Sequence, residues 1–466
     1  MPSKKLTKLA EWFLVGILVM FALFFRINRL EGRLTFEWDQ ERDIQAVESM
    51  VTTGTPALLG PIVRGNAGGF YLGPLYYYLI TPLYLSSGGN PLSLAVVSIG
   101  ADLLLIPLLY FFLRSRTSPF AAFVVSLIWA GSPLIIHNAY TPWNVSLIPL
   151  WSLFYLWTIE RLHLSGRLRH LVLLVFLSSV TTSIHVSLIP IAALVLLINW
   201  RHFLALRPRA YLYLISANIL PISTLIFHDL THRFENTILL KSFLFGVGGN
   251  PTSLGQILPL IFEKFGYTIG RLFTGEPYTA LGIIVVAVVM LVGFIKYRQS
   301  TVVKYNLITI IALLFSLMVY RNLDFAEYYF LPTFVSILIL LAYFCASIPK
   351  IIRLFIPVVF IVYYFQLGFA ARASSISPYS LTVKRQVLTE VKSLTYPVEI
   401  RTNLPRERNT GFTYLMKDMG INSDSGSSRK AYIYEAKNME IISPPEARSI
   451  ILDKPIQAFK LIVFSN

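Results

Sequence analysis

Charged residues are scarce in this chain of 466 amino acids, since only 14% of them are Asp, Glu, Lys or Arg. A soluble globular protein has about 25% charged and roughly 45–50% apolar residues, whereas 55% of this sequence is apolar. A soluble enzyme is therefore excluded. Intrinsic disorder is excluded as well, because the chain has 33 Phe, 25 Tyr and long aliphatic runs.

Cysteine is almost absent too. The single Cys345 lies in an apolar run, so it forms no intrachain disulfide and says nothing about redox compartment. The net charge of +16 is compatible with nucleic-acid binding, but the basic residues form no interleaved basic and aromatic patch. They punctuate hydrophobic segments instead. We therefore expect a membrane as partner and no nucleic acid.

The sequence also lacks a Walker-type phosphate loop, and no G-x-G-x-x-G motif follows a strand-like run. Nothing therefore indicates an ATP-driven pump. No His, Cys and Asp residues have the spacing of a zinc site. We predict no certain cofactor, and leave open a divalent cation held by carboxylates.

What is present is a series of apolar runs. Because a helix needs about 20 apolar residues to cross a hydrocarbon core of roughly 30 Å, we predict eleven spans. They are 9–25, 93–113, 119–136, 145–160, 170–183, 187–200, 211–227, 280–296, 305–320, 329–347 and 352–371. The expected fold class is an all-α polytopic membrane protein with a transmembrane module over 1–371. A small extracytoplasmic α/β domain follows over 372–466.

Basic residues collect in the loops that this layout places on one side of the membrane, as expected because cytoplasmic loops accumulate Lys and Arg. The inner segments carry Lys4, Lys5, Lys8, Arg114, Arg116, Arg161, Arg167, Arg169, Arg201, Arg207, Arg209, Lys296, Arg298, Lys304, Lys350 and Arg353. The outer loop 228–279 mixes both signs. We therefore predict a multi-pass protein of the cell membrane with a cytoplasmic N-terminus and an extracytoplasmic C-terminus.

Two apolar stretches do not fit a simple crossing. Counting 73–85 as a span would invert the charge pattern downstream, so we place it as an interfacial segment in a long first outer loop over 26–92. The stretch 171–200 is too long for one helix and is predicted to form a hairpin with its apex at 181–185. Polar groups at such depth are tolerated where they line a cavity, which suggests a wet cavity opening outward.

The first outer loop carries the acids Asp39, Glu41 and Asp43 next to Trp38. If this piece is helical, Asp39 and Asp43 share one face. A carboxylate there can act as general base toward an acceptor hydroxyl or help to bind a cation. The alternative is a solvated loop helix. Asp102 lies within a span, where a functional carboxyl and a neutral, hydrogen-bonded packing residue are equally good interpretations.

Four motifs resemble the membrane-embedded (GT-C type) glycosyltransferases that use polyprenyl-phosphate sugars, such as protein O-mannosyltransferases and the aminoarabinose transferases of lipid A. The motifs are Trp38 to Arg42, Gly73 to Tyr78, Tyr140 to Asn144 and Tyr328 to Pro332, and the resemblance covers roughly residues 9–371. It implies a GT-C-like fold.

The resemblance also implies site residues. Asp39 stands where the family has its catalytic base, and Gln40 stands where a second acid is usual, so Glu41 or Asp43 would have to complete a two-carboxylate metal site. Gly73 replaces a Lys that contacts the donor phosphate in several relatives. The remaining expected residues are Arg64, Arg321 and Tyr328 for the donor phosphate, and Glu41, Asp43, Trp143, Asn144 and His185 for supporting or acceptor-binding roles.

The expected function is that of an inverting glycosyltransferase. It would move a sugar from a polyprenyl-phosphate donor to a hydroxyl of a lipid, glycan or protein acceptor on the outer face of the membrane. The alternative is a transporter or flippase of polyprenyl-linked glycans, which would need polar residues along both halves of the membrane. The tail, with strand-like runs at 431–434 and 459–464, either helps to bind acceptor or acts as a structural cap.

Overall fold

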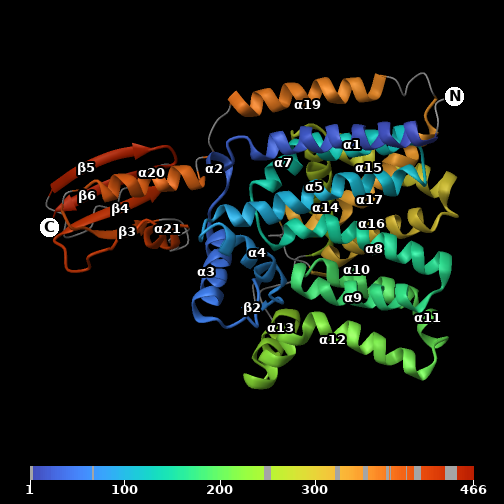
Figure 1. Ribbon diagram of the computed structural model, residues 1–466, viewed down its shortest axis with the longest axis horizontal. Coiled ribbons are helices and arrows are strands. Elements are labelled where there is room, and N and C mark those ends of the chain that lie inside the picture. Colours follow the sequence, from blue (N-terminus) through green and yellow to red (C-terminus); the bar gives the residue numbers. More distant parts are fainter. Residues whose placement is uncertain are drawn as a thin grey trace.

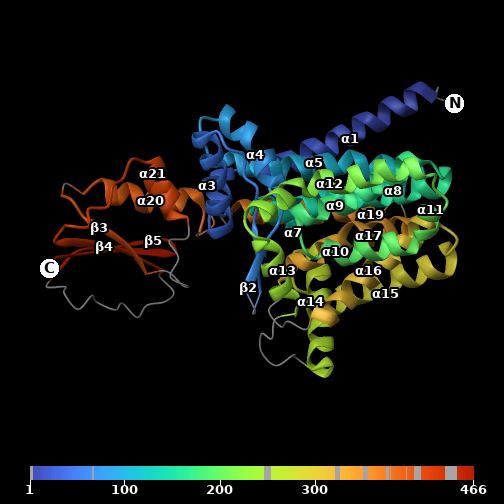
Figure 2. The same ribbon diagram turned by 90° about the horizontal axis from the view of Figure 1, so that it is seen from below.

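The computed structural model describes residues 4–465 except 66–67, 246–252, 321–325, 350–354, 374–376, 378, 395, 404–410 and 436–448. A long bundle of helices carries a small mixed sheet at one end, and the N-terminus lies at the other end (Figure 1). Helices α3 and α4 of the first outer loop lie between the bundle and the sheet, in both Figure 1 and Figure 2.

The described parts of the segments predicted to cross the membrane are helical except at Ser132, Ser187 and Asn199. They are α1 (Lys4–Ile27), α5 (Leu92–Arg114), α6 (Pro119–Gly131) with α7 (Pro133–Ala139), α8 (Ile148–Ser165), α9 (Leu168–Ile184), α10 (Leu188–Ile198), α12 (Pro208–Thr231), α15 (Thr279–Tyr297), α16 (Thr301–Tyr320), α17 (Leu331–Ser347) and α19 (Phe355–Ala373). A short helix, α11 (Trp200–Leu204), joins α10 to α12. Residues 352–354 of the last predicted span lie outside the described residues.

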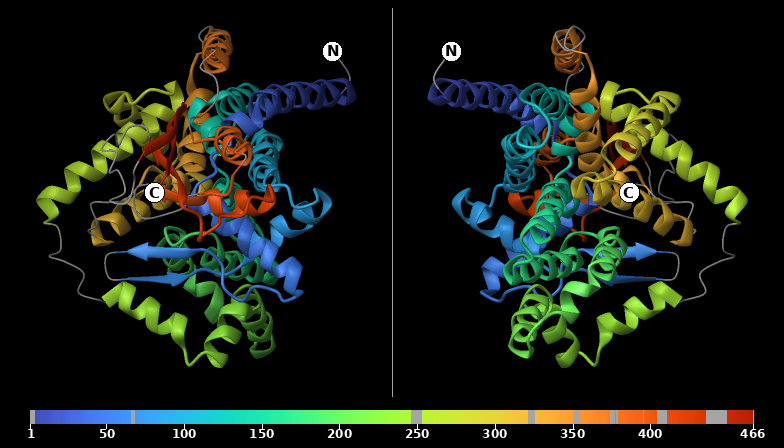
Figure 3. Two further views of the ribbon diagram at one scale, coloured as in Figure 1. Left: turned by 90° about the vertical axis from the view of Figure 1, so that its left-hand side faces the viewer. Right: turned by 90° about the vertical axis from the view of Figure 1, so that its right-hand side faces the viewer.

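Six of the described helices are long and apolar enough to cross a membrane, or seven if the bent pair α6 and α7 counts as one span. Seen along the bundle, α1 and α19 lie at its periphery (Figure 3). Their apolar side chains face outward, and Phe13 and Val359 are 71% and 64% exposed. Water would penalise such a surface, whereas lipid tails match it. The chain is therefore a mostly helical multi-span membrane protein; the count of eleven and the orientation of the termini stay predictions.

The predicted span over 119–136 is helical but bent. The chain bends by 52° between α6 and α7. The hydroxyl of Ser132 accepts from the backbone N–H of Ile135 and starts α7 as its N-cap, with Pro133 in the first turn. Proline has no N–H to donate to the preceding turn, so it begins a helix more readily than it continues one.

The break predicted within 171–200 is present, because α9 ends at Ile184 and α10 begins at Leu188. It lies at 185–187, whereas the first four residues of the predicted apex 181–185 belong to α9. His185 leaves the helix in an extended conformation, with φ −166° and ψ 144°. The apex carries its polar groups at the end of the bundle that faces α3 and α4 (Figure 1).

The first outer loop folds into short elements. They are α2 (Leu30–Arg33), α3 (Trp38–Thr53), the antiparallel hairpin of β1 (Ile62–Gly65) and β2 (Gly68–Tyr71), and α4 (Leu75–Ser86). The predicted interfacial segment is thus α4, whose 12 residues span only about 18 Å at 1.5 Å per residue. The second outer loop contains α13 (Glu235–Phe245) and α14 (Leu254–Thr274), and α14 packs along α15.

The C-terminal segment forms a four-stranded mixed sheet with two helices. Its elements are α20 (Leu381–Lys392), β3 (Glu399–Asn403), α21 (Phe412–Asp418), β4 (Arg429–Glu435), β5 (Ser449–Ile456) and β6 (Phe459–Ser465). The strand order is β3-β4-β6-β5, with β3 parallel to β4 and the other pairs antiparallel. Val387 and Val463 belong to the same continuous apolar core as the bundle, so this segment is packed onto the rest of the chain.

Candidate functional site

Helix α3 begins at the predicted acidic motif. Gln40 is its third residue, and its side-chain oxygen accepts from the backbone N–H of Glu37 at 3.1 Å, forming a capping box with the Glu37 side chain. The Gln40 amide also donates to the carbonyl of Pro142 at 3.0 Å. The residue that replaces the family's second acid therefore fixes the start of α3 against the turn that follows α7.

Arg42 joins the two acids that share a face of α3. Its guanidinium contacts an Asp39 oxygen at 2.7 Å and an Asp43 oxygen at 2.8 Å through Nε. The Asp39 side chain is 35% exposed, whereas that of Asp43 is fully buried. Sequence reasoning placed the two acids correctly on one face but missed Arg42, although its spacing from Asp39 is that of a helical ion pair.

Burial dominates the electrostatics of Asp43. It raises the pKa of this carboxyl to about 7, although Arg42 favours the charged form and lowers it in part. Tyr77 of α4 lies beside the same pair, and burial raises the pKa of its phenol well above the ordinary range. Asp43 is thus a carboxyl that changes charge near neutral pH beneath the more exposed Asp39.

Glu41 points to the other side of α3 and contacts the C-terminal segment. Its carboxylate accepts from the backbone N–H of Gly411 at 2.8 Å and of Tyr414 at 2.7 Å, at the start of α21. Burial raises the pKa of Glu41, and the two backbone donors oppose that shift. Close by, the buried Lys384 donates to the carbonyl of Phe36. Glu41 therefore holds the tail against α3.

An aromatic cluster brings together residues from distant parts of the sequence. Trp143 meets Tyr328 edge to face with ring centroids 4.6 Å apart, and His185 meets Tyr328 at 5.5 Å. Asn144 donates to the carbonyl of Ile184 at 2.6 Å, which fastens this cluster to the hairpin apex. The charge of Asp39 acts on the Tyr328 phenol. The predicted residues Trp143, Asn144, His185 and Tyr328 thus lie in one region, and Gln40 fastens the helix of Asp39 beside it through Pro142.

Gly73 contacts the same apex. Its backbone N–H donates to the carbonyl of Thr182 at 3.0 Å, and a Cβ at this position would lie 2.1 Å from the hydroxyl of Ser183. There is no room for a side chain here. The departure from the Lys of several relatives therefore reflects close packing of the first outer loop on the hairpin apex.

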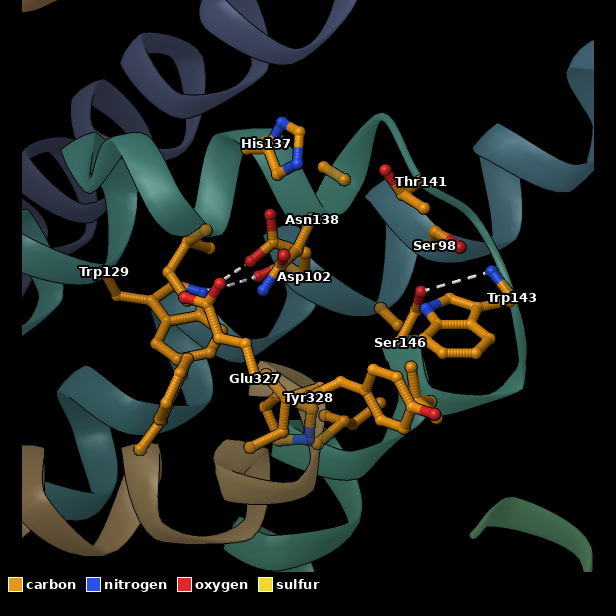
Figure 4. A pocket seen from close by; sticks show the side chains of 18 of the residues that line it. Ser98, Asp102, Trp129, His137, Asn138, Thr141, Trp143, Ser146, Glu327 and Tyr328 are labelled. Atoms are coloured by element: carbon orange, nitrogen blue, oxygen red, sulfur yellow. Dashed lines mark hydrogen bonds between the residues drawn. The ribbon is translucent and has the colours of Figure 1, made fainter. Parts of the chain in front are cut away.

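A cavity of about 210 Å³ opens between α5, α7, α8 and α17 (Figure 4). Its aromatic walls include Trp129, Trp143 and Tyr328, and its polar lining comprises Ser98, Asp102, His137, Asn138, Thr141, Ser146 and Glu327. Trp143 begins the short helix η1 (Asn144–Leu147), and Tyr328 lies on η2 (Glu327–Phe330). Rings beside hydroxyl, amide and carboxyl groups form a lining suited to a sugar.

Two ion pairs border this cavity. Asp102 of α5 pairs with Arg26 of α1, which is fully buried, and accepts from the indole N–H of Trp129 at 2.5 Å. Glu327 pairs with Arg271 of α14 at 2.5 Å. Its pairing across three helices supports a packing role for Asp102, but as the partner of Arg26 in an ion pair rather than as the expected neutral carboxyl. One side of Asp102 also lines the cavity. Sequence reasoning missed Glu327 and Arg271, which no motif links.

The two arginines predicted for the donor phosphate are not placed. Arg321 lies outside the described residues, and Arg64 belongs to β1 without a described side chain. Within the described part of the chain, no group of three or more His, Cys, Asp or Glu residues could hold a metal ion. Arg42 binds both acids of α3, and Glu41 faces the C-terminal segment, so Glu41 does not join this pair as a third carboxylate.

No family model and no curated protein matches the sequence, but solved structures do. ArnT from Cupriavidus metallidurans bound to undecaprenyl phosphate matches with a TM-score of 0.61 at 12% identity, over 96% of this chain and 97% of that one. Its apo state matches with a TM-score of 0.60 at 12% identity, over 97% and 98%. The archaeal oligosaccharyltransferase AglB from Archaeoglobus fulgidus reaches a TM-score of 0.47 at 12% identity, over 92% and 70%.

At this identity the match to ArnT is a statement about fold, and it covers nearly the whole of both chains, including the C-terminal sheet. The resemblance of the sequence to the GT-C type membrane glycosyltransferases, the group that includes the aminoarabinose transferases of lipid A, is thereby confirmed: this chain has the ArnT fold.

Proposed function

We propose that the protein is an inverting glycosyltransferase that moves a sugar from a polyprenyl-phosphate donor to an acceptor hydroxyl on the outer face of the membrane. The observation that carries the proposal is the position of α3, which holds the part-exposed Asp39: Gln40 of this helix donates to the carbonyl of Pro142, next to Trp143 of the sugar-sized cavity. At about 210 Å³ the cavity is smaller than the roughly 300–1,000 Å³ of pockets for drug-sized ligands, which suits one sugar ring. ArnT, with the same fold, was crystallised with undecaprenyl phosphate.

In this mechanism Asp39 accepts the proton of the acceptor hydroxyl, whose oxygen then attacks the anomeric carbon. The bond from that carbon to the phosphate oxygen breaks, and the polyprenyl phosphate leaves with the electron pair. One displacement inverts the anomeric configuration. The Tyr328 ring and Trp143 flank the sugar, while Asn144 and His185 shape the acceptor side. Asp43 sets the charge beneath Asp39 through Arg42.

Negative charge that develops on the leaving phosphate needs fixed cationic donors in a low-dielectric site. Arg64 and Arg321 are the first candidates, with the Tyr328 hydroxyl as a further donor. Arg271 is an additional candidate, since it pairs with Glu327 at the cavity and its charge also acts on His137.

The decisive experiment uses the purified protein in liposomes with a panel of radiolabelled polyprenyl-phosphate hexoses and pentoses. We expect one donor to label an acceptor fraction, and Asp39→Asn to abolish labelling while the protein still binds donor. Glu48→Gln, on the same helix but facing Lys417, is the matched control and should retain transfer. Movement of intact donor across the bilayer without transfer, unaffected by Asp39→Asn, would favour the transporter or flippase alternative.

A further inference from the structure

A second cavity, of about 640 Å³, lies where α8 ends and α9 begins. This turn is at the end of the bundle opposite to α3 and the C-terminal sheet (Figures 1 and 2). The cavity is therefore separate from the site described above, and an inference about it does not depend on the proposed glycosyl transfer.

The lining of this cavity is cationic. It includes Arg161, Arg167, Arg169 and His170, and none of the described residues that line it is acidic. The acid next to it in the sequence, Glu160, is turned away and held by Arg116 with Nε and Oε1 2.7 Å apart. The positive charges are thus not compensated by a carboxylate in the lining.

His170 is the buried member of this lining, whereas Arg161, Arg167 and Arg169 are exposed. His170 is only 8% exposed, and the guanidinium groups of Arg161, Arg167 and Arg169 all act on its ring. The Ser165 hydroxyl lies 2.7 Å from His170 Nδ1 and accepts from the backbone N–H of Arg167 at 3.3 Å. The Ser165 hydrogen bonds order this turn, and the three arginines share one cavity beside it, whereas basic residues that only set topology need no common cavity.

The start of α9 adds to the uncompensated positive charge. The first turn of α9 contains no acid, and Arg167, Arg169 and His170 occupy it or its cap. The N-terminus of a helix carries partial positive charge and favours anions, so cations at this position are destabilising. An anion bound in the cavity would remove the repulsion among the guanidinium groups and satisfy the exposed backbone donors of α9.

The apolar lining identifies the class of anion. Trp157, Leu164 and Leu173 share the cavity with the arginines, and Arg161 lies over the Trp157 ring at 5.5 Å from its centroid. A ligand that fits carries a phosphate and an adjoining apolar part, at the depth where spanning helices end. Phospholipid headgroups have this chemistry, and basic pockets between spans bind them.

We propose that the cavity at the turn between α8 and α9 binds the headgroup of an anionic phospholipid, with its phosphate on Arg161, Arg167 and Arg169. The acyl chains then run along Leu164 and Leu173. By the predicted topology this lipid belongs to the inner leaflet.

The test measures lipid adducts of the purified full chain by native mass spectrometry, with phosphatidylglycerol or phosphatidylcholine added. For Arg167→Gln/Arg169→Gln we expect a loss of phosphatidylglycerol adducts of roughly thirtyfold, since two basic residues near a membrane surface contribute about 1 kcal/mol each. The matched control, Arg207→Gln/Arg209→Gln, removes the same charge at the start of α12, outside the lining, and should bind as the wild type does.

Equal losses in both variants would overturn the proposal, because binding would then follow overall basic charge. Unchanged adducts in Arg167→Gln/Arg169→Gln would overturn it as well. Excess inorganic phosphate distinguishes the sources: binding of phosphate alone, with no preference for phosphatidylglycerol over phosphatidylcholine, would replace the lipid with a free anion. If the double variant does not fold, the exposed Arg161→Gln serves in its place and should also lose phosphatidylglycerol selectively.

Discussion

The Glu41 carboxylate accepts a hydrogen bond from the backbone N–H of Tyr414 at 2.7 Å, across 373 positions of sequence. The helix that carries the proposed base is thereby joined to the start of α21. Further hydrogen bonds, between Phe36 and Lys384 and between Gly32 and Ser377, lie along the same contact between the first outer loop and the C-terminal segment. Of the two interpretations of the tail, these contacts support a structural cap that fixes α3.

The Glu41 contact predicts a destabilised tail when it is removed. Glu41→Ala deletes the acceptor of two backbone donors, and hydrogen bonds to a charged group contribute about 1.5–3 kcal/mol each. We expect a lower melting temperature and faster proteolysis between 372 and 466. Glu48→Ala breaks the more exposed pair with Lys417 between the same helices and should have a much smaller effect. Equal losses of stability in the two variants would show that the Glu41 contact contributes no more than the pair of Glu48 and Lys417.

Asp43 predicts the pH dependence of transfer. Because its folded pKa is raised to about 7 from an ordinary value of 3.8, Asp43 is neutral below pH 7. Arg42 then pairs with only one charged carboxylate, that of Asp39. Above that pH, Asp43 ionises and shares Arg42, which leaves Asp39 freer to accept a proton. The transfer rate should rise through an inflection near pH 7.

Measurement of kcat/KM against pH checks this, and Asp43→Asn should remove the inflection and keep the low-pH rate. The stability of the fold changes with pH in the opposite direction to the transfer rate. The folded state holds the Asp43 proton more tightly than the unfolded state, so this group stabilises the fold at low pH, and its contribution is lost as pH rises from about 4 to about 7. A wild-type profile without an inflection would contradict the role of Asp43.

Close packing at Gly73 predicts that a second substitution, at Ser183, recovers activity lost in Gly73→Ala. Gly73→Ala places a Cβ 2.1 Å from the Ser183 hydroxyl and 3.1 Å from its Cβ, so the Ser183 side chain must turn away and the apex next to His185 is crowded. We expect about a tenfold loss of transfer, as small misplacements in an active site commonly cause. Gly73→Ala/Ser183→Ala removes the worst contact and should recover part of the activity. Gly100→Ala, where a Cβ meets nothing within 4 Å, is the control. A double variant no better than Gly73→Ala would point to another cause.

The buried pair of Arg26 and Asp102 predicts strong coupling. Asp102→Ala leaves the fully buried Arg26 without its counter-charge, which costs about 3–5 kcal/mol in comparable pairs. Arg26→Met/Asp102→Leu removes both charges and should be considerably more stable than either single variant. Melting temperatures in one detergent give the double-mutant cycle. Additive effects would mean that the pair is not coupled.

Three arginines are candidates for binding the donor phosphate, and each substitution predicts weaker donor binding. Arg64→Ala and Arg321→Ala should raise the donor KM, because each removes a charge expected to contact the phosphate. Arg271→Ala should also raise it if the Glu327 pair lies at the donor side. Steady-state kinetics with the active donor check all three, and an unchanged KM in every variant would show that the phosphate binds elsewhere.

The local features of this protein could be read from the sequence. Runs of apolar residues predicted helices at each proposed span, because a lipid environment forces every backbone donor to bond within its own segment. The polar run at 181–185 predicted the break between α9 and α10, and the four-residue spacing placed Asp39 and Asp43 on one face. Even Arg42 was within reach of such reasoning, since its partners lie one and three positions away.

Only the tertiary structure decided which distant groups meet. Glu41 finds Tyr414, Arg271 finds Glu327, and Trp143 finds Tyr328, through pairings that no periodicity encodes. Helical spacing reports neighbours within about one turn, whereas these contacts depend on how helices pack in three dimensions. The sequence thus determined where the apolar helices form and which acids share a face of α3, whereas packing decided the cavity and the contacts that hold the C-terminal segment on α3.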